Sequence, residues 1–163
     1  MIQDPAVKIR PAGPDDVPLI LKLIRHLAEF EKLAHEVEAT EARLGAALFP
    51  EDGRPAAECV LAFEGDDPAG FALYFATFST FLARPGIYLE DLFVVPERRG
   101  RGIGRALILH LARLANERGC GRMEWAVLDW NEAAIRFYES LGARRLQDWT
   151  TCRLAGEALA KFA

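Results

Sequence analysis

The sequence lacks the cysteine pattern of a disulfide-bonded or zinc-binding protein. Its three cysteines, Cys59, Cys120 and Cys152, are odd in number, widely spaced and free of any Cys-x-x-Cys pair. A basic excess is also missing, because 20 lysines and arginines stand against 24 acidic residues, so binding to a phosphate backbone is not favoured. These absences predict a protein of the reducing cytoplasm with no resident metal ion and no nucleic-acid partner.

Long apolar runs are absent as well. The longest uncharged stretch, residues 68–83, is shorter than the roughly 20 residues that a membrane helix needs. Residues 1–10 contain no apolar run of the signal-peptide type. We therefore expect no membrane span and no membrane partner.

The composition is that of one globular domain. The chain has 163 residues, of which 51% are hydrophobic. Such a chain can build a core that buries roughly two thirds of its unfolded surface. No linker, repeat or low-complexity segment interrupts it, which predicts a single domain over residues 1–163. Most basic residues are arginines and alanine is abundant, which we interpret as the composition of a GC-rich bacterial genome.

Hydrophobic periodicity predicts strands and helices in the first half of the chain. A helix is expected over residues 17–35, and its buried stripe recurs at helical spacing: Ile20, Leu23, Ile24, Leu27 and Phe30. A second helix is expected over residues 40–49, before Pro50. The strands predicted from alternation and β-rich composition are residues 7–10, 58–64, 70–78 and 87–95.

The second half of the chain alternates between the two kinds of element. Helices are predicted over residues 105–118 and 131–141, each ended by a glycine, with a strand over residues 123–128 between them. Strand, helix, strand and helix in succession indicate parallel pairing at this point. Residues 145–154 are expected to add one or two closing strands, and residues 157–162 a short helix.

The segment between the strand ending at Val95 and the helix beginning near Arg105 is rich in glycine and arginine. Three alternating glycines, Gly100, Gly102 and Gly104, allow a ligand to approach the backbone closely. The amides that open a helix favour an anion. The spacing matches neither a P-loop nor the dinucleotide fingerprint, so ATP and NAD are disfavoured. A pyrophosphate site is one interpretation, and a turn that only connects two elements is the other.

This segment resembles the acetyl-CoA motif of the GNAT superfamily of N-acetyltransferases in its pattern Arg99-x-x-Gly102-x-Gly104. The resemblance extends over nearly the whole chain and includes Ile9-Arg10-Pro11-Ala12, the run from Tyr88 to Val94, Trp130-Asn131-Glu132 and Phe137-Tyr138-Glu139. Within the superfamily the chain is similar to the diamine group, the spermidine/spermine and thialysine acetyltransferases. The resemblance implies an α/β (α+β) fold with a central mixed, splayed sheet of about six to seven strands flanked by helices.

The resemblance also implies acetyl-CoA as the donor and assigns residues to it. Backbone groups of Phe93, Val94 and Val95 are expected to meet the pantetheine arm. The pyrophosphate is expected to be wrapped by Arg99, Gly100, Arg101, Gly102, Ile103, Gly104 and Arg105. Asn131 is expected to cap its helix and to contact the donor as well. No metal ligands are implied.

Acetyl transfer to an alkylamine needs a base for the ammonium proton and an acid for the departing thiolate. The resemblance suggests Glu90 as the base, acting through a water, and Tyr138 as the acid. Consecutive strand residues point to opposite faces, so Glu90 and Asp91 share one cleft only if a bulge lies there. Asp91 and Glu31 are expected to bind the acceptor. The alternatives are a solvated carboxylate for Glu90, a core aromatic for Tyr138 and an exposed helix charge for Glu31.

The predicted function is acetylation of a primary amine of a small molecule by a cytoplasmic enzyme. Diamines, polyamines and lysine-like compounds are the expected acceptors, and the resemblance implies a homodimer. The segment from Phe78 to Gly86 differs from the acceptor-side loop of the polyamine enzymes, so the sequence does not specify a polyamine. Two other functions stay open, namely a non-catalytic acetyl-CoA-binding domain and an acetyltransferase that acts on protein amines.

Overall fold

The computed structural model describes residues 7–163, which divide into two compact units. The first unit runs to Ala126, and the second comprises Val127–Ala163. The first contains five strands and the helices α1, α2 and α3, whereas the second contains α4 (Glu132–Ser140) and the short α5 (Gly156–Ala160). Within residues 7–163, no helix is long and apolar enough to cross a membrane.

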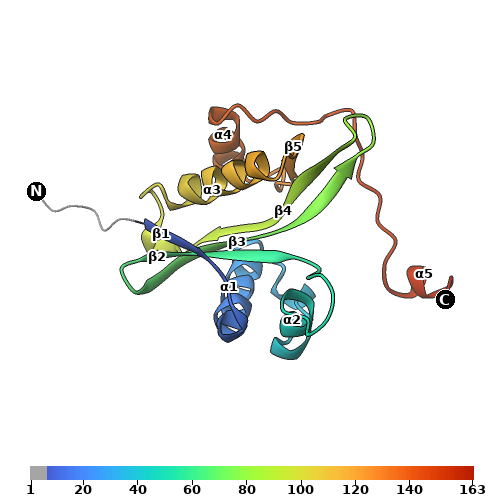
Figure 1. Cartoon of the computed structure of the whole chain (residues 1–163), viewed down its shortest axis with the longest axis horizontal. Helices are drawn as coiled ribbons and strands as arrows, with labels where there is room; N and C mark the ends of the chain where they lie inside the picture. The colour runs from blue at the N-terminus through green and yellow to red at the C-terminus, as the bar shows by residue number, and fades with distance from the viewer. Residues whose placement is uncertain (1–6) are drawn as a thin grey trace, which may run out of the picture. The chain divides into compact units, whose positions relative to one another are not determined.

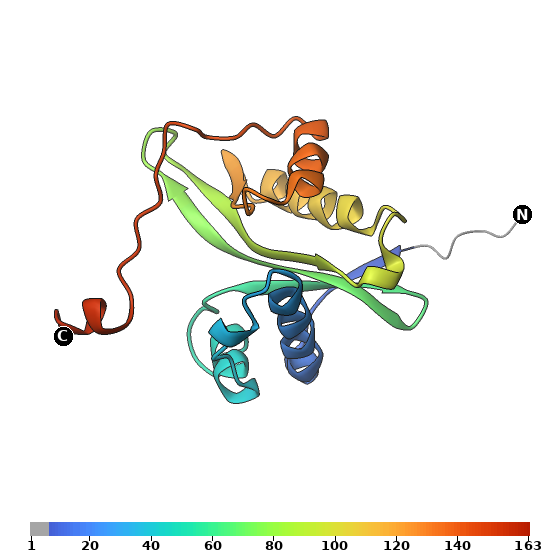
Figure 2. The same cartoon turned by 180° about the vertical axis from the view of Figure 1, so that it is seen from behind.

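A five-stranded mixed sheet forms the centre of the first unit (Figures 1 and 2). Its strands lie side by side in chain order: β1 (Val7–Pro11), β2 (Glu58–Glu64), β3 (Asp67–Ser79), β4 (Arg84–Val94) and β5 (Arg122–Trp125). Neighbours are antiparallel except β4 and β5, which are parallel. Short turns join β2, β3 and β4, whereas α3 provides the crossover that a parallel pair requires. The predicted parallel pairing is confirmed.

Helices cover both faces of this sheet. The helices α1 (Val17–Phe30) and α2 (Glu41–Leu48) lie on one face and α3 (Ile103–Glu117) on the other (Figure 1). Three residues of the predicted α1 stripe, Ile20, Leu23 and Leu27, are buried in a core with side chains of β2, β3 and β4, whereas Phe30 is exposed. Short 3-10 turns precede α1 (Pro14–Asp16), precede α2 (Ala34–Glu36) and follow β4 (Pro96–Arg98).

The strand β4 is longer than its parallel partner. Pairing with β5 begins at Gly86 with Arg122 and ends at Leu89 with Trp125. The remaining residues of β4, 90–94, extend past β5, and residues 91–94 stay paired with β3. The sheet is therefore open along one side of β4, just before the glycine-rich segment.

A β-bulge lies at the point where β4 leaves β5. Asp91 pairs with Leu73 and Leu89 pairs with Tyr74, so Glu90 is an extra residue in the β3–β4 register. Such a bulge bends its strand and interrupts the alternation of side chains. The condition under which Glu90 and Asp91 could share one cleft is thus met.

Helix α1 ends at Phe30, earlier than the expected residue 35. Lys32 has a positive φ of 61°. The Lys32 amide donates to the Glu29 carbonyl (3.1 Å) and the Leu33 amide to the Ala28 carbonyl (2.7 Å). These two bonds form a Schellman motif, in which the left-handed residue is usually glycine. The sequence has lysine there, so it gave no sign that the helix stops.

The expected closing strands at residues 145–154 are also wrong. The second unit contains no strand within Val127–Ala163, so the described sheet has five strands rather than six or seven. Residues 145–154 are exposed throughout. Aromatic and β-branched residues favour a strand only where a neighbouring strand offers pairing and burial, which a pattern within one segment does not reveal.

The left-handed Lys32 leads to a stability prediction. A non-glycine residue in this conformation costs about 1 kcal/mol, so Lys32→Gly is expected to raise the free energy of unfolding by roughly that amount. Urea unfolding of the variant beside Lys32→Ala, which keeps the strain and removes the charge, checks the expectation. Equal stabilities of the glycine and alanine variants would contradict it.

Candidate active site

The segment after β4 forms a tight turn that leads into α3. Gly100 and Gly102 have positive φ values of 76° and 78°, and Gly102 is the N-cap of α3. A Cβ built on either glycine would meet no atom within 4 Å, so backbone conformation, and not crowding, requires glycine here. The first amides of a helix have no partner within the helix and favour an anion. The turn therefore fits a phosphate group.

Two arginines of this turn are held by acidic residues of the β2–β3 hairpin. Arg98 donates to Glu64 (2.5 Å) and to Asp67 (2.8 Å). Arg101 donates to the same Glu64 oxygen (3.2 Å) and to the Glu97 carbonyl (3.3 Å). The Glu64 side chain is only 3% exposed. Sequence reasoning treated the arginines as charge around an anion and missed Glu64, whose partners lie more than 30 residues away along the chain.

The third arginine of the turn connects it to helix α1. The Arg99 Nε donates to the Val94 carbonyl at 3.0 Å. Its guanidinium carbon lies 4.5 Å from the centre of the Phe30 ring and 5.5 Å from that of Phe93. Arg99 thereby links the end of α1, the end of β4 and the turn through cation–π contacts.

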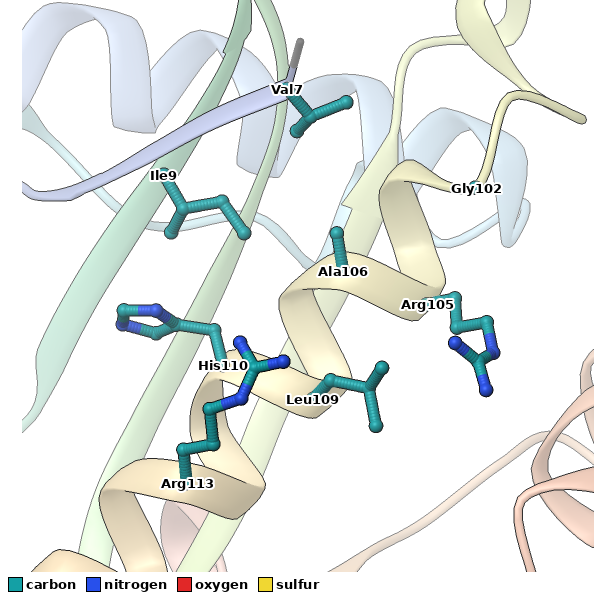
Figure 3. Close-up of a pocket in the computed structure, with 8 residues that line it drawn as sticks. All are labelled: Val7, Ile9, Gly102, Arg105, Ala106, Leu109, His110 and Arg113. Carbon is teal, nitrogen blue, oxygen red and sulfur yellow. The ribbon is translucent and has the colours of Figure 1, made fainter.

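Basic side chains of α3 line a pocket beside the turn. The pocket has a volume of about 460 Å³, and Figure 3 shows Arg105, His110 and Arg113 on α3, with Val7 and Ile9 of β1 across from the helix. Gly102 also lines it. A larger depression of about 730 Å³ lies on the α1 side, where Phe30, Phe93 and Arg98 are among its lining residues. The turn is thus flanked by two hollows.

The backbone at the end of β4 already has several partners. The Val95 amide donates to the Ala69 carbonyl (3.0 Å), and the Val95 carbonyl accepts from the Arg98 amide (3.0 Å). The Phe93 side chain is buried in the core. Because the Val94 carbonyl accepts from Arg99, any further donor at that oxygen would share it.

Of the three carboxylates expected on the acceptor side, Asp91 is affected electrostatically by the other two. The pKa of Asp91 is raised to about 6, first by burial and then by the negative charges of Glu90 and Glu31. Burial also raises the pKa of Glu31, which follows the last residue of α1. Glu90 is exposed, whereas Asp91 and Glu31 are half-buried. Asp91 thus lies within electrostatic range of both Glu90 and Glu31.

Neighbouring side chains place Asp91 on the α1 and α2 face of the sheet. Its partner Leu73 belongs to the core beneath these helices, as do Phe71 and Phe93 on the same face. The extra residue in β4 allows Glu90 to point to the same side. No group of three His, Cys, Asp or Glu residues within 7–163 is arranged to hold a metal ion. The carboxylates form a loose acidic surface.

An aromatic pair adjoins these carboxylates. The rings of Phe75 and Tyr88 are stacked with their centres 5.2 Å apart. Burial raises the pKa of Tyr88, and the charges of Glu90 and Glu124 contribute to the shift. The sequence pattern alone did not indicate a role for this pair. The turn at residues 79–84 could have revealed it, because the hairpin register sets Phe75 opposite Tyr88.

The second unit contains the remaining candidates. The Asn131 side chain accepts a hydrogen bond from the Ala134 amide (3.2 Å), so its predicted role as the N-cap of α4 is confirmed. Tyr138 is half-buried on α4, and its ring centre lies 5.2 Å from that of Phe137. The predicted catalytic role of Tyr138 stays a prediction.

Comparison with known proteins identifies the family. The model of the acetyltransferase (GNAT) family matches residues 21–143. The chain belongs to the GNAT family of acetyltransferases. It is 38% identical to a thialysine N-epsilon-acetyltransferase of Mus musculus, over 97% of this chain and 98% of that protein. It is 36% identical to an L-ornithine N5-acetyltransferase of Arabidopsis thaliana, over 93% of this chain and 86% of that protein.

Solved structures agree with the GNAT fold. An integron cassette protein from the mobile metagenome of V. cholerae has a TM-score of 0.75 and 29% identity, and the match covers 96% of both chains. A probable acetyltransferase with 23% identity has a TM-score of 0.74 over 91% of this chain and 97% of its own, which supports the fold alone. The expected α+β fold, with a mixed sheet flanked by helices, is confirmed.

The carboxylate surface of this acetyltransferase leads to a prediction about pH. The folded pKa of Asp91, about 6, lies above its ordinary value of 3.8, so the folded state binds the proton more tightly than the unfolded chain does. Its contribution to stability is present below pH 4 and is lost as the pH rises through 6. Asp91→Asn is expected to be more stable than the parent at pH 7.5, by on the order of 2 kcal/mol.

Unfolding of the parent and the variant from pH 4 to pH 8 is the measurement. The difference should shrink toward zero near pH 4. Asp16 and Glu58, whose arginine partners Arg10 and Arg118 lower their pKa values, destabilise both proteins equally in acid and cancel in the comparison. A difference that does not vary with pH would contradict the prediction.

Proposed function

We propose that this GNAT enzyme transfers the acetyl group of acetyl-CoA to a primary amine of a small molecule. The observation behind the proposal is the surface at the β4 bulge, where Glu31, Glu90 and Asp91 interact beside the stacked rings of Phe75 and Tyr88. Carboxylates attract an ammonium group, and aromatic rings stabilise a cation. Relatives named for thialysine and ornithine acetylation favour a diamine, polyamine or lysine-like acceptor.

Deprotonation of the acceptor is the first chemical requirement. An amine with a pKa of about 10.4 is only about 0.04% neutral at pH 7, which is a handicap of roughly 4.6 kcal/mol. We assign proton removal to Glu90, acting through a water, because it is the exposed member of the cluster and lies at the bulge. Asp91 and Glu31 bind and orient the acceptor ammonium.

The donor is assigned to the turn and to the end of β4. Acetyl-CoA supplies the activated acetyl group as a thioester. The positive φ values and open surroundings of Gly100 and Gly102, together with the start of α3, fit its pyrophosphate. The proposed donor-binding residues are Phe93, Val94 and Val95 for the pantetheine, Arg99, Gly100, Arg101, Gly102, Ile103, Gly104 and Arg105 for the pyrophosphate, and Asn131 for a further contact.

Tyr138 is assigned as the acid that protonates the departing thiolate. A thiol with a pKa of about 8.5 leaves more readily when a hydroxyl donates a proton to it. The similarity of residues 131–139 to the diamine acetyltransferases supports this role. The half-buried position of Tyr138 on α4 is compatible with it.

Assembly as one domain and as a homodimer is part of the proposal. The family model extends across the boundary between the two units, which supports a single acetyltransferase domain over residues 1–163. The second unit exposes several large apolar side chains: Leu146, Trp149, Leu154, Leu159 and Phe162. Exposed apolar groups of this size are typical of surfaces that are buried on association.

A steady-state screen of small amines with acetyl-CoA tests the function. Release of free thiol with diamines, ornithine or lysine analogues, and acetylated product by mass spectrometry, are the expected results. Gly102→Asp is the negative control, because it sets a carboxylate and a strained left-handed residue at the phosphate turn. Turnover only with protein amines would favour a protein acetyltransferase. Acetyl-CoA binding without turnover would favour a binding domain.

The base assignment predicts an altered pH profile. Glu90→Gln should lower kcat/KM most near neutral pH and less at higher pH, where more of the amine is already neutral. The matched control is Glu124→Gln, since Glu124 lies across from Tyr88 in the β4–β5 register and pairs with Arg122. Profiles of the two variants and the parent are compared. A Glu90→Gln profile parallel to that of the parent would contradict the role of Glu90 as the base.

The acid assignment predicts a loss confined to chemistry. Tyr138→Phe keeps the ring beside Phe137 and deletes the hydroxyl, so kcat should fall by on the order of 100-fold while acetyl-CoA affinity changes little. Tyr74→Phe is the control, because the Tyr74 hydroxyl lies 3.4 Å from Glu58 in a structural contact. Turnover at the parental rate in Tyr138→Phe would show that the hydroxyl takes no part in the chemistry.

A further inference from the structure

Glu64 is a buried carboxylate to which the proposed chemistry gives no task. It is the last residue of β2, and its side chain is 3% exposed. A buried charge is costly unless it is paired and hydrogen-bonded. The pairing here is unusual in that two guanidiniums, of Arg98 and Arg101, reach one oxygen, Oε2, and both come from the segment that leads into α3.

The contacts of Arg98 and Arg101 attach the segment before α3 to the β2–β3 hairpin. Arg98 bridges Glu64 and Asp67, which lie on either side of the hairpin turn. Arg101 reaches back to the Glu97 carbonyl while it contacts Glu64. The part of the chain between the two arginines is therefore held at both of its ends by one side chain.

Without these contacts, ordering the segment from Arg98 to Arg101 would cost conformational entropy. It contains Gly100 and leads directly into Gly102, and both have positive φ. Glycine loses more conformational freedom than other residues when it is fixed in one conformation. A ligand binds more tightly to a loop that is already in its bound conformation, because binding then carries no entropic cost of ordering that loop.

We propose that Glu64 is a positioning residue for the donor, which holds Arg98 and Arg101 so that the turn before α3 is preformed for the pyrophosphate of acetyl-CoA. This inference rests on the proposed function. In this arrangement Arg98 and Arg101 hold the turn in place, and Arg101 stays beside the pyrophosphate while the first amides of α3 and Arg105 face it. Glu64 itself does not touch the donor.

The solvent exposure of Glu64, Arg98 and Arg101 indicates which substitution leaves the protein folded. Glu64 is its buried member, whereas the side chains of Arg98 and Arg101 are 24% and 47% exposed. Glu64→Gln keeps the shape and one carbonyl oxygen and removes the buried charge, while both arginines remain partly exposed and Arg98 keeps its contact with Asp67. The matched control is Asp67→Asn, because Asp67 also contacts Arg98 but is 73% exposed, where solvent screens the pair.

Calorimetric binding of coenzyme A and steady-state kinetics form the test. Glu64→Gln is expected to raise the Kd for coenzyme A and the KM for acetyl-CoA by about tenfold, with the acceptor KM and kcat at saturating donor unchanged. Asp67→Asn should stay within about twofold of the parent. Rescue of affinity by Glu64→Asp, which restores the charge on a shorter side chain, should be partial.

The outcomes separate this inference from the proposed function. Coenzyme A affinity of a folded Glu64→Gln protein equal to that of the parent would overturn the inference alone, and so would an equal loss in Asp67→Asn. A parent protein that does not bind coenzyme A would contradict the proposed function. If Glu64→Gln does not fold, Arg98→Met decides, because Arg101 still pairs with Glu64. Parental affinity in that variant would overturn the inference.

Discussion

The unequal pairing of β4 on its two edges is the constraint on which the rest of the site depends. On one edge β4 pairs with β3 along its length, and on the other it pairs with β5 only from Gly86 to Leu89. A strand held on one side alone keeps its direction but leaves its other edge open. The extra residue, Glu90, lies where the second partner ends, so the bend of the strand and the opening of the sheet coincide.

Charged side chains differ between the bulge in β4 and the turn that follows the strand. Acidic and aromatic side chains lie around the bulge, and the raised pKa of Asp91 reflects its burial first and then the neighbouring charges of Glu90 and Glu31. Beyond the end of the strand, arginines are neutralised by Glu64 and Asp67, or cover Phe30 and Phe93. A cationic acceptor would therefore meet the carboxylates at the bulge, whereas an anionic donor would meet the first amides of α3 and Arg105 rather than the paired arginines.

The sequence predicted most of the elements because they depend on local patterns. The strands around residues 58–64 and 70–78, the cap Asn131 and the glycine turn before α3 all follow from periodicity or capping chemistry. The failures depend on information that is not local. Lys32 adopts a glycine-like conformation without being glycine, and residues 145–154 have strand-forming residues without a partner strand.

The site was predictable to a similar degree. Resemblance indicated Glu31, Glu90 and Asp91, and the charges of Glu90 and Glu31 both act on Asp91 in the structure, while their roles stay a prediction. No pattern in the sequence marks the bulge that allows Glu90 and Asp91 to share a side, because a bulge is a property of two strands. Glu64 was missed for a related reason, since a carboxylate at the end of an ordinary strand gains its importance from arginines that approach it in three dimensions.

The strand order of the sheet has a consequence for how the protein behaves at high concentration. The two longest strands, β3 and β4 with 13 and 11 residues, are interior, whereas the outer strands β1 and β5 have five and four. The outer strands also carry charged side chains, among them Lys8 and Arg10 on β1 and the paired Arg122 and Glu124 on β5. Short, charged outer strands offer few hydrogen-bonding groups to a foreign strand, so β1 and β5 are poor templates for fibril growth, and free groups for such pairing lie instead on the edge of β4 beyond Leu89.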